Sequence, residues 1–162
     1  MRTFALLGCS SEKTGPAHGR NTPVPIRELY SSQLFQLRLR YIEARGLSWA
    51  VLSALHGYVE ADRSLHAYNF TMRNQTPFQK AMWPIGVVED FLQANIPDHV
   101  SPRSWTIEIH AGAAYYEPLA TILRAIGFTV LLPVEGRTIG IQLQWYTRQL
   151  DTLSKSSEVH AE

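Results

Sequence analysis

The chain has 162 residues, a formal net charge of +1 and a single cysteine. This length suffices for one compact domain, and 45% apolar with 18% charged residues is typical of a globular protein rather than a disordered chain. One cysteine excludes a disulfide framework, and no apolar run reaches the roughly 20 residues that span a bilayer. We therefore expect a soluble cytoplasmic protein without a membrane partner. Most of its cationic residues are Arg, which weakly favours an anionic partner.

Apolar and β-branched runs alternate with helical patterns along the chain. Four runs predict strands covered on both faces: Thr3–Leu7, Trp49–Ser53, Trp105–Ile109 and Phe128–Leu132. The helices are expected from about Gln33 to Arg45, from Pro77 to Asn95 with a kink or break at Pro84, from Leu119 to Ile126 after Pro118, and from Ile139 to Leu153. Residues 14–28 and 57–76 are expected to be irregular.

This alternation predicts an α/β fold. We expect a single three-layer domain over residues 1–153, with a mainly parallel sheet of four strands or slightly more, followed by a flexible tail over residues 154–162. In open sheets of this kind, ligands bind at the carboxyl ends of the strands.

Glycine and polar side chains follow each predicted strand. The four segments are Gly8 to Lys13, Ala54 to Tyr58, His110 to Tyr116 and Pro133 to Gly140. Glycine lets a ligand approach the backbone, and helix N-termini favour anions. Ser10, Ser53, His110 and Glu135 are therefore expected to share one edge of the sheet and one pocket, although ordinary turn residues would give the same composition.

Common enzyme motifs are missing. The chain contains no Walker A loop, no G-x-S-x-G elbow and no G-x-G-x-x-G fingerprint, and its histidines lack metal-ligand spacing, so we expect no cofactor and no metal. Cys9 is either a nucleophile with His56 or His110 as base, or a small buried residue. His110 fits a hydrogen-bonded core histidine equally well.

Several segments together resemble a known family. The stretch from Ser53 to Met72 begins "LSALHG", continues through an acidic turn, and reaches Tyr68-Asn69. With "GCSSEK", "RELYSSQLF", "AGAAYYEPL" and "GRTIGIQLQWY", it resembles the YaaA-like (peroxide-stress protein) family and its small bacterial and phage relatives, over residues 3–150. The resemblance implies DNA binding and protection, and more distantly a fold like that of uracil-DNA glycosylases. Asn69 stands where the smaller domains often carry aspartate.

The resemblance favours a nucleobase-processing enzyme, and most concretely a DNA glycosylase acting on a modified base. In this hypothesis Asp62 or Asn69 positions water, and His56 or His110 stabilises the departing base. The base would stack on aromatic side chains, and the substrate-binding residues are Ser10, Ser11, Lys13, Ser53, Tyr68, Gly112, Tyr115, Glu135 and Arg137, with Tyr58 and Tyr116 as further stacking candidates.

Two alternatives stay open for function, and two for single residues. The chain could be a non-catalytic nucleotide- or nucleic-acid-binding module, or an N-glycosidase or deoxyribosyltransferase acting on free nucleotides with Glu135 or Glu117 as nucleophile. Tyr68 also fits a core aromatic, and Asp62 a simple turn residue. The expected partner is DNA or a nucleotide, and the sequence leaves the oligomeric state open.

Overall fold

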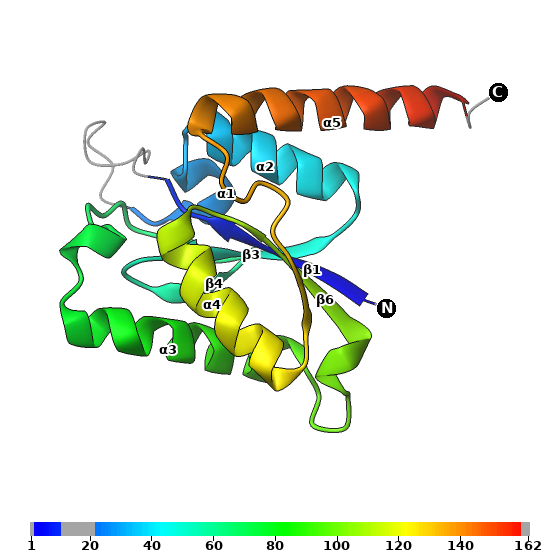
Figure 1. Cartoon of the computed structure of the whole chain (residues 1–162). Coiled ribbons are helices and arrows are strands. Elements are labelled where there is room, and N and C mark those ends of the chain that lie inside the picture. The colour runs from blue at the N-terminus through cyan, green and yellow to red at the C-terminus, as the bar shows by residue number, and fades with distance from the viewer. Residues whose placement is uncertain (1, 11–21, 160–162) are drawn as a thin grey trace.

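The computed structural model describes residues 2–10 and 22–159, in which a five-stranded sheet forms the centre. The strand order is β4-β3-β1-β6-β7 (Figure 1). The parallel strands are β1 (Arg2–Gly8), β3 (Ser48–Ser53), β6 (Trp105–His110) and β7 (Thr129–Leu131), and β4 (Gly57–Glu60) runs antiparallel to β3. The predicted, mainly parallel sheet is thus confirmed. Its fifth strand, β4, comes from a segment that was expected to be irregular.

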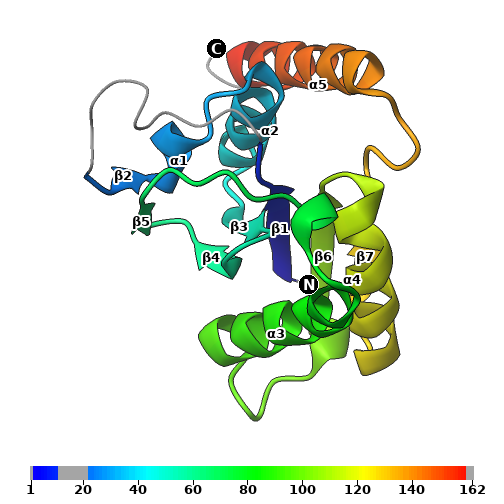
Figure 2. The ribbon, with the colours of Figure 1, turned by 90° about the vertical axis from the view of Figure 1, so that its left-hand side faces the viewer.

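Helices cover both faces of the sheet. One face carries α2 (Gln33–Ala44) and α5 (Ile139–Val159), and the other carries α3 (Pro77–Asn95) and α4 (Ala113–Ile126) (Figures 1 and 2). Successive residues of a strand point to opposite faces. Phe4 and Leu6 of β1 therefore pack into the core beneath α3 and α4, while Ala5 and Leu7 pack beneath α2 and α5. The run is continuously apolar because both of its faces are buried.

The strand order reverses between β1 and β6. The connection from β1 to β3 passes through α2 on one face, whereas the connection from β6 to β7 passes through α4 on the other. Helices that diverge in this way leave a crevice at the carboxyl ends of the two central strands. In Figure 1 the amino-terminal ends of α2, α4 and α5 all lie at the left, where β1 ends.

Short elements complete the described chain. They are β2 (Val24–Pro25), α1 (Ile26–Leu29), β5 (Ser64–Leu65), and the 3₁₀ turns Met72–Asn74 and Pro102–Ser104. β2 pairs antiparallel with β5. This pairing brings Tyr30, which follows α1, towards Tyr68, which follows β5, although the two residues are far apart in the sequence.

Three helix predictions need correction. α4 begins at Ala113, not at Leu119, so Pro118 lies inside the helix instead of opening it. The extended Gly112 serves as its N-cap, and Tyr116 and Leu119 are buried on either side of the proline. α3 likewise continues through Pro84, so the helix does not break there, because buried residues on both sides hold it against the sheet.

The last helix, α5, runs through Val159 and so includes the first residues of the segment expected to be a tail. Among the described residues, no helix is long and apolar enough to cross a membrane.

Candidate functional site

The central strands approach each other closely at their carboxyl ends. A Cβ atom on Gly8 would lie 2.9 Å from the Cβ atom of Ala111, which follows β6. This separation is shorter than any normal contact, so only glycine fits where β1 passes the end of β6. The next residue, Cys9, donates its backbone N–H to the carbonyl of Leu52 at 3.1 Å. Cys9 is thereby fixed between the ends of β3 and β6.

Four hydroxyl groups gather around the Cys9 thiol. The Ser53 and Tyr68 hydroxyl oxygens are 2.6 Å apart, the Tyr68 and Tyr30 oxygens are 2.8 Å apart, and the Cys9 Sγ atom lies 3.4 Å from the Tyr115 hydroxyl. We call Cys9, Tyr30, Ser53, Tyr68 and Tyr115 the hydroxyl cluster. Tyr30 and Ser53 are fully buried, whereas Cys9, Tyr68 and Tyr115 are partly exposed. The cluster therefore has partly exposed polar groups that are supported by buried ones.

The tyrosines of this cluster stay uncharged at physiological pH. Burial raises the pKa of Tyr30 to about 12, partly offset by its hydrogen bond with Tyr68. Burial, followed by the electrostatic effect of Cys9, also raises the pKa values of Tyr68 and Tyr115. A neutral hydroxyl can donate or accept a hydrogen bond. The cluster can thus match a ligand edge that mixes donors and acceptors.

The turn after β3 is built on Ser53. Its Oγ atom accepts the backbone N–H groups of Leu55 at 3.2 Å and His56 at 3.0 Å, and its carbonyl accepts the indole N–H of Trp83 at 2.8 Å. The His56 ring lies edge-on to the Tyr68 ring, with centroids 5.1 Å apart. Burial lowers the pKa of His56, which favours a neutral imidazole. His56 and Tyr68, both predicted site residues, are therefore brought together.

A cavity of about 450 Å³ opens beside the hydroxyl cluster, at the crevice between β1 and β6. Its lining consists of Cys9, Ser10, Ser32, Gln33, Leu34, Arg38, Gly112, Ile139, Gln142 and Leu143. We call it the Arg38 cavity. Arg38 is only 6% exposed and donates from Nη2 to the Gln142 Oε1 atom at 2.8 Å. Ser10 and Gly112, two predicted substrate-binding residues, belong to this cavity.

His110 lies in the core, as one of its two predicted alternatives required. Its Nδ1 atom is 2.7 Å from the Tyr146 hydroxyl, and its Nε2 atom is 3.2 Å from Glu108 Oε2. Arg45 donates two hydrogen bonds to the Glu108 carboxylate, at 2.6 and 2.9 Å. With no exposed surface, His110 cannot touch a ligand in this conformation.

The charges in this buried network are well defined. Burial raises the pKa of Glu108, but its hydrogen bonds with His110 and Arg45 outweigh burial and lower the pKa to about 2. Burial lowers the pKa of His110 despite its contact with Glu108. The neutral imidazole then donates from Nε2 to Glu108 and accepts the Tyr146 hydroxyl at Nδ1.

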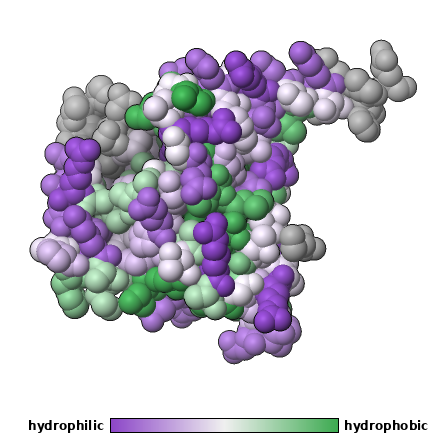
Figure 3. All heavy atoms as spheres, viewed as in Figure 1, coloured by the Kyte–Doolittle hydropathy of each residue, from purple (hydrophilic) through white to green (hydrophobic). Residues whose placement is uncertain are grey.

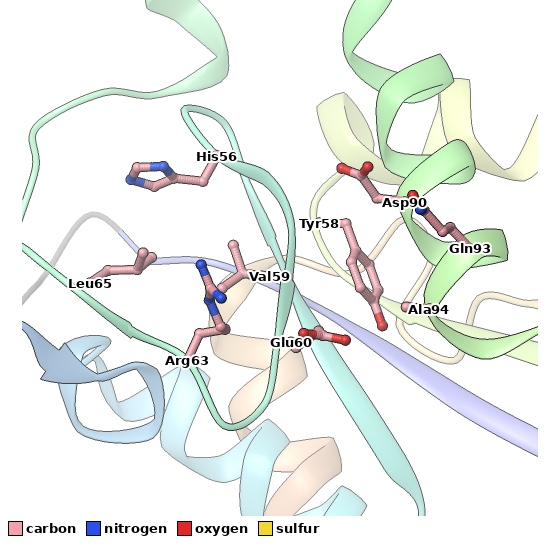
Figure 4. A pocket seen from close by; sticks show the side chains of 9 residues that line it. All are labelled: His56, Tyr58, Val59, Glu60, Arg63, Leu65, Asp90, Gln93 and Ala94. Carbon is pink, nitrogen blue, oxygen red and sulfur yellow. The ribbon is translucent and has the colours of Figure 1, made fainter.

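A second cavity, of about 470 Å³, lies between β4 and α3 (Figure 4). Figure 4 shows Tyr58 and Asp90 on one side of β4 and His56 and Arg63 on the other. Its charged residues, Glu60, Arg63 and Asp90, are exposed, and none forms an ion pair with another described residue. This cavity therefore lacks the buried polar groups of the hydroxyl cluster.

The remaining predicted residues make no hydrogen bond to the hydroxyl cluster within the described chain. Asp62 and Asn69 are exposed, and neither forms a hydrogen bond with another described residue that would hold it against the cluster. Glu135 and Arg137 are exposed in the loop between β7 and α5. The residues expected to share one pocket are therefore divided. Ser53 is a buried member of the hydroxyl cluster, Ser10 lines the Arg38 cavity, and Glu135 belongs to neither the cluster nor the cavity. Ser11 and Lys13 lie outside the described residues.

Sequence reasoning missed Arg38 and Gln142, although Arg38 carried a signal. It lies four residues after Leu34 and four before Ile42, on the face of α2 that was expected to be apolar. A cation on such a face must be paired or must serve a ligand. Tyr30 was also missed, because nothing in its local pattern points to the sheet edge.

The fold and the site together define a doubly wound α/β domain with a polar site at the point where its strand order reverses. Residues 4–148 match the model of DUF6884, a family of unknown function, and the chain belongs to this family. No curated protein and no solved structure matches the chain. Since the family description gives no activity, the resemblance to YaaA-like proteins and to uracil-DNA glycosylases stays a prediction.

Proposed function

We propose that this chain is a nucleotide-binding domain in which a nucleobase lies against the hydroxyl cluster. The observation that carries the proposal is the proximity of two hydrogen-bonded groups near the carboxyl ends of the central strands. One group joins Ser53, Tyr68 and Tyr30 over 2.6 and 2.8 Å, and the other joins Cys9 and Tyr115 at 3.4 Å. The edge of a nucleobase alternates donors and acceptors, which neutral hydroxyls can match in either sense. Aromatic rings beside them offer faces on which a base can stack.

The choice of binding over catalysis follows from where the carboxylates lie. A glycosylase needs a group that positions water at the sugar. Asp62 and Asn69, the residues predicted for this role, are exposed and are not hydrogen-bonded to the cluster among the described residues. Binding needs only the hydroxyls and rings, and these are assembled. The resemblance to a DNA-associated family adds support for a nucleobase as the ligand.

The experiment is a calorimetric titration with nucleosides, nucleotides and short oligonucleotides, with and without modified bases. Tyr68→Phe removes one hydroxyl from the cluster and should weaken binding about tenfold, since a lost hydrogen bond costs about 1 to 2 kcal/mol. The matched control is Tyr58→Phe, which removes a hydroxyl that accepts from Asn95 Nδ2 at 2.8 Å, outside the cluster. This control should bind normally. No binding of any of these ligands at millimolar concentration would end the proposal.

N-glycosidic bond cleavage is a second candidate function, and His56 is the observation that favours it. A neutral imidazole at the cluster can accept a proton from water or position it. We expect His56→Gln to reduce the release of a modified base, read as alkali-labile abasic sites, by about 100-fold. His99→Gln, at an exposed histidine away from the cluster, is the control. A wild-type protein that binds nucleotides but releases no base would leave only the binding function.

A further inference from the structure

Arg38 is a buried cation without an anionic partner among the described residues. Its side chain lines the Arg38 cavity at 6% exposure, and its Nε atom makes no hydrogen bond. The partners that orient it are neutral: the Gln142 amide oxygen at 2.8 Å, and the Tyr146 hydroxyl. Buried charges in proteins are normally paired. A guanidinium in a cavity that no described carboxylate neutralises therefore points to an anionic ligand.

The backbone around the cavity favours an anion independently of Arg38. Ser32 is the N-cap of α2, Gly112 is the N-cap of α4, and Ile139 is the first residue of α5, and all three line the cavity. Each of these helices ends there with the positive pole of its dipole. Gly112 has no side chain to occupy the first N–H groups of α4. Three helix N-termini thus face one cavity that contains a buried arginine.

The arginine is held in place from behind. Gln142 accepts from Arg38 through Oε1 while its Nε2 atom donates to the carbonyl of Arg137 at 2.8 Å. The second bond fixes which end of the amide meets the guanidinium. Gln142 is itself buried, and its backbone N–H donates to the carbonyl of Thr138 at 2.9 Å. The guanidinium is therefore preorganised at the wall of the cavity.

We infer that the Arg38 cavity is the phosphate subsite of the proposed nucleotide site and that its ligand is a phosphomonoester. The inference rests on the proposed function for the base, but the phosphate chemistry is argued separately. A planar guanidinium fork matches phosphate oxygens, and helix N-termini supply N–H donors for them. About 450 Å³ suits a mononucleotide or a terminal phosphate, whereas the internal phosphates of a duplex would have to enter a recess at the switch point.

Cys9 joins the two parts of the site. It lines the Arg38 cavity, and its thiol lies 3.4 Å from Tyr115 in the hydroxyl cluster. A ligand with its phosphate at Arg38 and its base at the cluster would therefore pass over Cys9. Figure 3 shows apolar side chains over the start of α5, where Ile139 and Ile141 are 65% and 49% exposed. Of these two side chains Ile139 lines the cavity, and it adds no competing charge.

The test measures the binding of inorganic phosphate by ³¹P NMR and by thermal unfolding, followed by calorimetry with a nucleoside and its 5′-monophosphate. Wild type should bind phosphate in the millimolar range or tighter, and the monophosphate should bind at least tenfold more tightly than the nucleoside. Arg38→Gln should lose this difference. Arg40→Gln, at an exposed arginine of the same helix, should keep it.

Gln142→Glu is a second variant, needed in case Arg38→Gln loses phosphate binding only because it does not fold. It places a carboxylate against Arg38 and so supplies the missing anion from within the chain. We expect this variant to fold, because the new ion pair with Arg38 offsets the lost hydrogen bond to the Arg137 carbonyl, and to lose phosphate binding at least tenfold. If Gln142→Glu folds and binds phosphate like wild type, the subsite is refuted.

The outcomes separate this inference from the proposed function. The phosphate subsite would be overturned if the wild type does not bind inorganic phosphate and binds nucleosides as tightly as their monophosphates. The base-binding proposal would then remain intact. Phosphate binding without any nucleoside binding would support the subsite and overturn the base-binding proposal. A 5′-phosphorylated oligonucleotide tested against the free monophosphate then identifies the source of the phosphomonoester.

Discussion

Replacing Glu108 with glutamine should lower the free energy of unfolding at neutral pH and reduce its dependence on pH in the acid range. The folded pKa of Glu108 is about 2, against an ordinary value of 4.5. A difference of about 2.5 in pKa, at about 1.4 kcal/mol for each unit, gives about 3.5 kcal/mol of stability. Because the folded pKa is depressed, this stability is present above pH 4.5 and is lost as the pH falls towards 2. Glu108→Gln should therefore destabilise the domain by about 3.5 kcal/mol at pH 7 and by much less at pH 2.5.

His110 adds an earlier acid effect that must be separated from this one. Burial lowers its pKa, so the unfolded chain takes up a proton below about pH 6.5 while the folded domain does not. This contribution is lost as the pH falls below 6.5, and it persists in Glu108→Gln. Urea unfolding followed by tryptophan fluorescence, at intervals from pH 2.5 to 7, resolves the two effects. The exposed Glu89→Gln is the control and should match wild type throughout.

Two results would contradict this role of the Glu108 charge. A Glu108→Gln variant as stable as wild type at pH 7 would mean that the ion pair with Arg45 merely offsets the cost of burying both charges. A stability difference that stays constant from pH 7 to pH 2.5 would mean that the substitution acts through packing, not through the charge of Glu108.

Two further predictions test the geometry of the site. Gly8→Ala places a Cβ atom 2.9 Å from the Cβ of Ala111 and should destabilise the domain by about 1–3 kcal/mol in urea unfolding. The control Gly86→Ala, in open space within α3, should be neutral or stabilising by roughly 0.5–1 kcal/mol. Equal effects of the two substitutions on stability would refute the close approach of Gly8 to Ala111. Asp62→Asn and Asn69→Ala should leave nucleotide affinity in calorimetry unchanged, since both residues are exposed, and a tenfold loss in either variant would place that residue in the binding site.

The sequence predicted those parts of the fold that depend on local pattern. Thr76 and Gln79 form a capping box at the start of α3, and Ser32 caps α2, so both helices begin where their sequence signals placed them. β1 and β3 are mainly apolar runs, as expected for burial on both faces, whereas β6 alternates apolar residues with Thr106, Glu108 and His110, and β7 buries only Val130. β4 was missed because it is an edge strand of four residues with a single buried side chain.

The site was less predictable because its contacts join residues that are distant in the sequence. Arg38 and Gln142 are 104 positions apart, and Cys9 and Tyr115 are 106 apart. Tyr30 reaches Tyr68 through the pairing of β2 and β5, which have two residues each and too little periodicity to be recognised. The strand-end rule did locate Ser10, Ser53, Gly112 and Tyr115 near the site, because the parallel sheet itself brings those ends together.

The buried network and the Arg38 cavity are parts of one hydrogen-bonded chain. Glu108 orients His110, His110 holds the Tyr146 hydroxyl at 2.7 Å, and Tyr146 contacts Arg38. Burial raises the pKa of Tyr146, so its hydroxyl remains neutral and can accept from the guanidinium while donating to His110. His110, predicted from the sequence either to stabilise a departing base or to lie in the core, is buried between Glu108 and Tyr146 and thereby helps to position the Arg38 guanidinium. Weakening the Glu108 network should therefore alter the Arg38 cavity through Tyr146, which would link the acid stability of the domain to the proposed binding of an anion in that cavity.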